Sequence, residues 1–241
     1  MDPSRIAALL EPFLEAPLSE PQLEQISTYI DLLLRWNARI NLTAIRDPEQ
    51  IVPRHFGESL FLARHVLPPT GGHRSLATDH RPTTTVLDLG SGAGFPALPI
   101  KIWDPSIHLT MVEANHKKAA FLREAARALK LMNVDVIAAR AESLRKSAAI
   151  AKSSKHSEKS PEQAAPEVLS RRPDVVTFRA VEKFDQILQT AASFLGPTSQ
   201  IAILITEAQQ STLELFPNVE WQLTHIPQSH SRKLAIAIKV A

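Results

Sequence analysis

The sequence predicts an α/β protein in which a seven-stranded, mostly parallel sheet follows a helical extension and ends in an antiparallel hairpin. Before residue 68, apolar residues recur at the three- and four-residue spacing of amphipathic helices. From residue 84 onward, short β-rich runs alternate with helical stretches, which is typical of parallel strands joined by right-handed crossovers. Three of the seven glycines fall between positions 90 and 94, directly after the first predicted strand. These observations predict helices on both faces of the sheet and an open loop at the end of its first strand.

The N-terminal part of the chain predicts two helices. The segment Pro21–Ile40 carries apolar residues in helical register, and a second helix begins at Asp47, where a capping acid precedes a proline. We expect the second helix to run to about Val66, with Pro53 kinking or restarting it. The expected organisation is a helical extension packed on the core over residues 1–67, a turn-rich linker over 68–83 and the main domain over 84–241.

Seven strands and three longer helices are predicted in the main domain. The strands are Thr84–Leu89, His108–Val112, Val134–Ala138, Asp174–Phe178, Gln200–Thr206, Glu220–His225 and Lys233–Val240. The helices are Phe95–Trp103, His116–Leu131 and Val181–Leu195, with a short turn after Ala141. Only the short segment IPQSHS separates the last two strands, which favours an antiparallel hairpin at one edge of the sheet.

The stretch 146–170 has the composition of an insertion. It is rich in Ser, Lys, Ala, Glu and Pro and poor in large apolar residues, so we expect a solvated, disordered segment between the third and fourth strands. Residues 145–172 hold seven basic and three acidic side chains, whereas the rest of the chain is slightly acidic. The body is therefore not a strongly basic nucleic-acid binder, and any polyanion must meet a local basic patch.

Composition excludes several classes of protein. With no cysteine, the chain cannot use disulfides, cysteine–zinc sites, iron–sulfur clusters or a thiolate nucleophile. The sequence has no run of eighteen apolar residues, so no membrane span is predicted. Because the N-terminus also lacks the pattern of a secretory signal, we expect a cytoplasmic protein. The nine histidines show no ligand spacing with acids, so no metal site is expected.

The loop after the first strand predicts a nucleotide-like ligand. It contains Gly90, Gly92 and Gly94, followed by Phe95 where a dinucleotide fingerprint needs glycine or alanine. The spacing G-x-G-x-G, with Asp88 two residues before it, is the pattern of S-adenosylmethionine enzymes, and a carboxylate suits the ammonium group of that ligand. A glycine turn that only packs a helix on a strand is the alternative.

Two further positions extend this candidate site. Glu113 ends the second strand, where an acid can hold ribose hydroxyls, although it could also cap the helix that begins at His116. Ala141 and Glu142 follow the third strand, where the adenine of a cofactor would lie, and an ordinary helix start is the alternative there.

Two blocks of sequence carry a family resemblance. The first runs Trp36-Asn37-Ala-Arg-Ile40-Asn41-Leu42-Thr43 and continues through Arg46-Asp47-Pro48 and Arg54-His55 to Glu58-Ser59-Leu60. The second is the glycine loop with Phe95-Pro96, joined later by Thr177-Phe178-Arg179-Ala180. Together they resemble the bacterial small-subunit rRNA methyltransferase G family, also called the glucose-inhibited division protein B family. The resemblance covers about residue 20 to the end, and the first block is the more specific one, because many methyltransferases share the glycine loop.

The resemblance implies the Rossmann-like fold of class I S-adenosylmethionine methyltransferases and methyl transfer to N7 of a guanine in 16S rRNA. It implies cofactor contacts at Gly90, Phe95, Ala141, Glu142 and Arg179. The chain departs from the family at Ile205-Thr206-Glu207-Ala208, where relatives usually carry a Lys-Gly pair, and in the 146–170 insertion.

The residues agree with such chemistry. Guanine N7 has an exposed lone pair and needs no general base, so catalysis is mainly alignment of the reacting atoms. Arg179 could orient the base or the cofactor, or pair with Glu182. Candidate RNA contacts are Arg46, Arg54, His55, Arg232, Lys233 and Lys239. His55 could equally be a hydrogen-bonded core histidine.

The expected partner is 16S rRNA or the small ribosomal subunit, and the protein is expected to be a monomer. Two other functions stay open: methyl transfer to a protein or small molecule, and rRNA binding without catalysis. The N-terminal block favours RNA, since small-molecule enzymes have no need of it.

Overall fold

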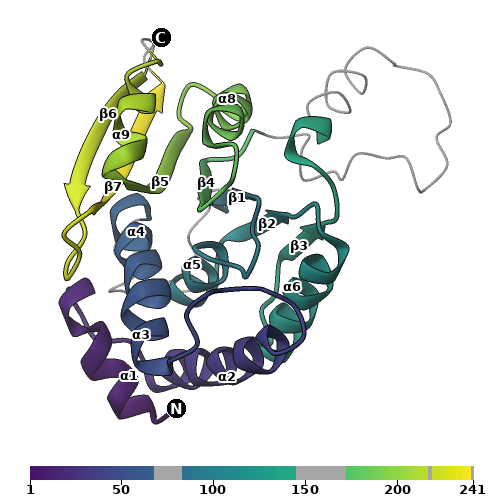
Figure 1. Ribbon diagram of the computed structural model, residues 1–241, viewed down its shortest axis with the longest axis vertical. Coiled ribbons are helices and arrows are strands. Elements are labelled where there is room, and N and C mark those ends of the chain that lie inside the picture. Colours follow the sequence, from purple (N-terminus) through teal and green to yellow (C-terminus); the bar gives the residue numbers. More distant parts are fainter. Residues whose placement is uncertain (68–82, 145–171, 217–218, 240–241) are drawn as a thin grey trace, which may run out of the picture.

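The computed structural model describes residues 1–67, 83–144, 172–216 and 219–239, and its centre is a seven-stranded sheet in the order β3-β2-β1-β4-β5-β7-β6. The first five strands are parallel, and β7 runs antiparallel to both β5 and β6. Figure 1 shows the sheet from the yellow β6–β7 hairpin at one edge to β3 at the other. The strands are β1 Thr85–Leu89, β2 His108–Val112, β3 Val134–Ile137, β4 Val175–Arg179, β5 Gln200–Thr206, β6 Val219–His225 and β7 Arg232–Lys239. The predicted fold class, strand number and terminal hairpin are confirmed.

Apolar residues fill both faces of the sheet because successive side chains of a strand point to opposite sides. In β1, Val86 joins one buried core, and Leu87 and Leu89 join the other. The helices α5 (Ala97–Trp103) and α6 (His116–Ala128) pack with the N-terminal helices on the first face. The helices α8 (Phe184–Phe194) and α9 (Glu207–Leu213) cover the second. Because β1 to β4 are parallel, their carboxyl ends meet at one edge of the sheet, where a site can form.

The N-terminal extension forms more elements than its periodicity predicts. They are α1 (Pro3–Leu10), a 3₁₀ turn (Glu11–Phe13), α2 (Glu20–Asn37), α3 (Pro48–Ile51), a π-helical segment (Val52–Gly57) and α4 (Glu58–Val66). The side chain of Asp2 caps α1 by accepting from the backbone N–H of Arg5. The helix was expected to run from Asp47 to about Val66, with Pro53 kinking or restarting it. It is interrupted at 52–57 by the π-helical segment, because Pro53 has no N–H to donate to the preceding turn.

Several helix ends differ from the prediction for local reasons. The helix α6 ends before Lys130, whose φ of 54° is left-handed. The helix α8 begins at Phe184 rather than Val181, because Lys183 before it has a non-helical backbone. The helix α9 was not predicted; Thr206 and Gln209 form a capping box at its start. This short helix begins with Glu207 and Ala208, in the segment where the resemblance leads us to expect a Lys-Gly pair.

Two predicted segments lie outside the described residues: the insertion at 146–170 and, except for residue 83, the linker at 68–83. Among the helices that the structure describes, none is both long and apolar enough to cross a membrane. The division of the chain into extension, linker and main domain stays a prediction.

Candidate functional site

A cleft of about 1060 Å³ opens at the carboxyl ends of β1 to β4. Four segments at the strand ends border it. The rest of its wall comes from the N-terminal extension (Leu42, Thr43, Ala44 and His55), from α6 (Lys118) and from α8 (Gln186 and Ile187). The segments at the strand ends are Gly90–Ala93 with Phe95, Val112–Ala114, Ala139–Ser143 and Arg179–Lys183. Residues far apart in the sequence therefore share one ligand-sized space.

The glycine loop between β1 and α5 has a backbone that other residues adopt poorly. Gly90 and Gly94 have φ angles of 71° and 83°, in the left-handed region. A Cβ at Gly94 would lie 2.5 Å from the Tyr29 hydroxyl and 2.7 Å from Leu98 Cδ1. The loop therefore needs glycine both for its backbone angles and for close packing against α2 and α5.

Glu113 ties the ends of β1 and β2 together. Its Oε2 accepts from the backbone N–H of Gly92 at 2.8 Å, and its Oε1 accepts from the N–H of Asn115 at 2.7 Å. The cap of α6 is Asn115, whose side chain accepts from the N–H groups of Lys117 and Lys118. Helix capping is thus the task of Asn115, and Glu113 is a buried carboxylate on the cleft wall.

Asp88 lies beneath the glycine loop, outside the set of residues that line the cleft. Its side chain is fully buried, and neither carboxylate oxygen has a hydrogen-bond partner among the described residues. Burial raises the pKa of Asp88 to about 7. The neighbouring Thr177 of β4, in register with Asp88, also has a buried hydroxyl without a partner in the described structure.

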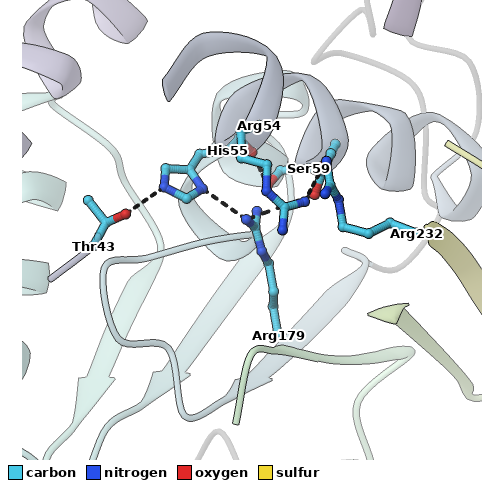
Figure 2. Close-up of polar contacts among 7 residues, drawn as sticks. Thr43, Arg54, His55, Ser59, Arg179 and Arg232 are labelled. Atoms are coloured by element: carbon cyan, nitrogen blue, oxygen red, sulfur yellow. Dashed lines mark hydrogen bonds and ion pairs between the residues drawn. The ribbon is translucent and has the colours of Figure 1, made fainter. Parts of the chain in front are cut away.

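Arg179 ends β4 and enters a cluster of charged residues from the extension and the terminal hairpin. Its Nη2 donates to Nδ1 of His55 at 2.8 Å and lies 3.9 Å from Oε2 of Glu58 (Figure 2). Oε1 of Glu58 accepts from Nη1 of Arg54 at 2.5 Å and from Nε of Arg232 at 2.6 Å. One buried carboxylate therefore holds three arginines together.

A stack of aromatic rings lies beside this cluster of charged residues. The ring of Phe95 stacks between His55 and Tyr29, at centroid distances of 4.8 and 5.2 Å. The hydroxyl of Tyr29 donates to the backbone carbonyl of Ala93. Tyr29 on α2 and His55 on the π-helical segment thus both support the loop that follows β1.

The sequence comparisons decide the family. The profile described as rRNA small subunit methyltransferase G matches residues 22–234. The protein belongs to this family. The protein of the same name from Chloroflexus aggregans is 34% identical over 238 residues, which cover 93% of this chain and 85% of the relative. That from Bacillus subtilis is 39% identical over 125 residues, covering 52% of this chain and 47% of the relative.

Among solved structures, a putative O-methyltransferase from Klebsiella pneumoniae superposes with a TM-score of 0.56. It is 14% identical, and the match covers 88% of this chain and 90% of that one. At this identity the likeness concerns the fold, which is that of class I methyltransferases. The chain is accordingly a methyltransferase of the rRNA small subunit methyltransferase G family.

Most of the residues expected to contact a cofactor meet in the cleft. Its wall includes Gly90, Gly92, Phe95, Glu113, Ala141, Glu142 and Arg179. Gly94 and Asp88 lie behind this wall. Arg179 pairs with His55 and Glu58 rather than with Glu182.

The expected RNA contacts are only partly gathered. Arg54 and Arg232 meet at Glu58 and border a second hollow of about 390 Å³. Arg46 is exposed, Lys233 donates to Gln210, and the side chain of Lys239 lies outside the described residues. His55 is buried with both ring nitrogens in hydrogen-bond contact, as in the core-histidine alternative, and its contact with RNA stays a prediction.

Sequence reasoning gave no role to Glu58 and Tyr29, which organise the site. Glu58 follows Arg54 by four residues, a spacing that signals a helical ion pair. Nothing in the sequence links Glu58 to Arg179 or Arg232, which are more than a hundred residues away. In the described part of the chain no group of three or more His, Asp or Glu side chains could hold a metal ion.

Proposed function

We propose that this protein transfers a methyl group from S-adenosylmethionine to N7 of a guanine in 16S rRNA. The observation that carries the proposal is the cleft at the carboxyl ends of β1 to β4, in a chain of the rRNA small subunit methyltransferase G family. The substrate, rRNA of the small subunit, comes from the names of the family and of its relatives.

The residues of the cleft fit this cofactor. Gly90 and Gly92 add no side chain to the cleft wall, so that a ligand can approach the backbone there, and Phe95 offers an apolar ring. Glu113 is a buried acceptor for ribose hydroxyls, and Ala141 with Glu142 would border the adenine. The unpartnered carboxylate of Asp88, one layer deeper, favours a positively charged group above it. Arg179 supplies donors for a carboxylate or a base.

The proposed chemistry needs alignment more than proton transfer. When bound, S-adenosylmethionine supplies a methyl group on a positively charged sulfur, and guanine N7 attacks with its free lone pair. The side chains of the cleft would hold the two reactants in line and exclude water. His55 fits a role without proton transfer, because both of its ring nitrogens are already in hydrogen-bond contact.

We propose that RNA lies across the mouth of the cleft and over the hollow bordered by Arg54 and Arg232. Arg46, His55, Lys233 and Lys239 are the further proposed contacts. With one tyrosine and 5% aromatic residues, the chain offers few platforms for stacking bases, so phosphate contacts and RNA shape should dominate recognition. We propose that the protein acts as a monomer on 16S rRNA or the small subunit, in the cytoplasm.

The decisive experiment maps N7-methylguanine in 16S rRNA after incubation with the protein and S-adenosylmethionine. Wild type should methylate one guanine, and Gly90→Val, whose side chain fits neither the left-handed backbone nor the 3.1 Å approach of Val181, should not. Arg127→Gln, at an exposed position on α6, is the matched control. If the protein binds S-adenosylhomocysteine but forms no N7-methylguanine, the proposal is wrong. The protein would then be a methyltransferase for another substrate or a non-catalytic rRNA-binding protein.

A further inference from the structure

The guanidinium of Arg179 is held on one side and unpartnered on the other. Its side chain is only 11% exposed although it borders the cleft. Nη2 donates to Nδ1 of His55, but Nη1 is buried and has no hydrogen-bond partner in the described structure (Figure 2). A buried donor without a partner costs free energy, so it calls for an explanation, and a ligand of the adjoining cleft is one.

The contact with Arg179 fixes the tautomer of His55. A guanidinium has only donors, so Nδ1 of His55 must accept and therefore carries no proton. The proton of the neutral ring then sits on Nε2, which faces Oγ1 of Thr43 at 2.8 Å. That hydroxyl oxygen also accepts from the N–H of Ile45 at 3.1 Å. Thr43 thus binds the ring at Nε2, while Nδ1 of the same ring accepts from Arg179.

The loop that carries Thr43 is itself anchored. The side chain of Asn37, at the end of α2, donates to the carbonyl of Thr43 and accepts from the N–H groups of Leu42 and Thr43. The ring of His55 also stacks on Phe95. The hydrogen bond to Thr43 of the anchored loop and the ring contact with Phe95 therefore leave His55 little freedom to turn.

Burial and the charges around it keep His55 neutral. Arg179 on β4 and Arg54 on the π-helical segment face it, and Glu58 on α4 is the acid of the cluster. Burial and then the two arginines lower the pKa of His55 to about 3. At neutral pH the ring remains an acceptor for Arg179, and Glu58 is the carboxylate that balances part of the positive charge.

We propose that His55 and Glu58 are positioning residues, which hold the guanidinium of Arg179 at the border of the cleft, where it serves the bound ligand. The proposal deepens the function proposed above, since it rests on Arg179 serving the bound cofactor or the guanine. Thr43 and Phe95 fix His55, His55 and Glu58 fix Arg179, and Arg179 meets the ligand. His55 itself transfers no proton.

The first test reads the tautomer without any ligand. Nitrogen-15 NMR of the imidazole rings, assigned with His55→Asn, should show His55 protonated at Nε2 and not titrating between pH 5 and pH 8. A ring protonated at Nδ1, or one that titrates near pH 6.5, would overturn the proposal. This result does not depend on methyl transfer, so it separates the proposal from the proposed function.

The second test is a double-mutant cycle on S-adenosylhomocysteine affinity by calorimetry and on the single-turnover rate with 16S rRNA. His55→Leu removes the acceptor, and His55→Asn keeps one near the position of Nδ1. We expect His55→Leu to lower at least one of the two readouts, by up to about 100-fold, since small misplacements of a positioned group have effects of this size. His55→Asn should restore part of the loss.

The cycle with Arg179→Ala distinguishes positioning from a structural role. If His55 acts through Arg179, adding His55→Leu to Arg179→Ala should cause almost no further loss. Equal losses in both backgrounds would overturn the proposal. Glu58→Gln is the second positioning variant, and its melting temperature is measured first, because it leaves three arginines without their carboxylate. If the wild-type protein does not methylate 16S rRNA, the proposed function is wrong. The double-mutant cycle on S-adenosylhomocysteine affinity would still test the positioning of Arg179.

Discussion

Gly94→Ala and Gly92→Ala should differ sharply in stability although both change the same loop. Both glycines have left-handed φ angles, of 83° and 56°, so alanine carries a similar backbone cost of about 1 kcal/mol at either position. A methyl group at Gly94 would lie 2.5 Å from the Tyr29 hydroxyl. At Gly92 the nearest atom is the carbonyl oxygen of Gly90, at 3.8 Å.

The extra cost at Gly94 follows from these distances. Forcing a methyl into a packed site costs about 1–3 kcal/mol, and displacing Tyr29 endangers its hydrogen bond to Ala93, which contributes about 1 kcal/mol. We therefore expect Gly94→Ala to lose about 3–5 kcal/mol of unfolding free energy, and Gly92→Ala about 1 kcal/mol.

Urea unfolding followed by circular dichroism measures both losses, with an unchanged slope required for the comparison. Affinity for S-adenosylhomocysteine is measured in parallel. Gly92 lines the cleft, so its variant should lose more affinity than stability. Equal stability losses for the two variants would refute the packing of Tyr29 against the loop.

The remaining predictions concern charge, pH and the insertion. Burial raises the pKa of Asp88 from 3.8 to about 7, so the contribution of Asp88 to stability should be greatest below about pH 4 and be lost as the pH rises to 7. Asp88→Asn should remove this dependence in urea titrations and exceed wild type at pH 8 by up to about 4 kcal/mol. The single-turnover methylation rate should stay nearly flat from about pH 6.5 to 8.5, because the pKa of His55 is about 3; a rise near pH 6.5 that His55→Gln abolishes would contradict this. Glu113→Ala should weaken S-adenosylhomocysteine binding by about 1–3 kcal/mol in calorimetry, whereas Glu182→Ala, exposed at the rim, should change it little. Replacing 146–170 by a short Gly/Ser link should leave the melting temperature within a few degrees, because that composition offers little to bury, and a large drop would count against the expected disorder.

Local patterns were enough to predict the sheet. Alternating apolar runs and helical stretches predicted all seven strands to within about two residues, and the short connection before β7 predicted the hairpin. The same patterns missed α1, α9 and the π-helical segment. Short helices have few turns in which periodicity can be recognised. Pro53 signalled an interruption of the helix, but not that the interruption would be a π-helical segment.

The cofactor side of the cleft was predictable because it follows directly from strand ends. Gly90, Glu113 and Ala141 come after successive strands, and parallel strands bring their carboxyl ends to one edge. The cluster around Glu58 could not be predicted in this way. His55, Arg179 and Arg232 come from segments more than fifty residues apart, and only the packing of the extension against β4 and β7 joins them.

The sequence alone determined the fold class, the family resemblance and the types of residue available, because these depend on local spacing and composition. The tertiary structure decided the partners of each charged group. Whether Arg179 pairs with Glu182 or with His55, and whether His55 is exposed or buried, depends on contacts between distant segments. Burial then sets their pKa values, since the cost of removing a charge from water depends on everything that surrounds it.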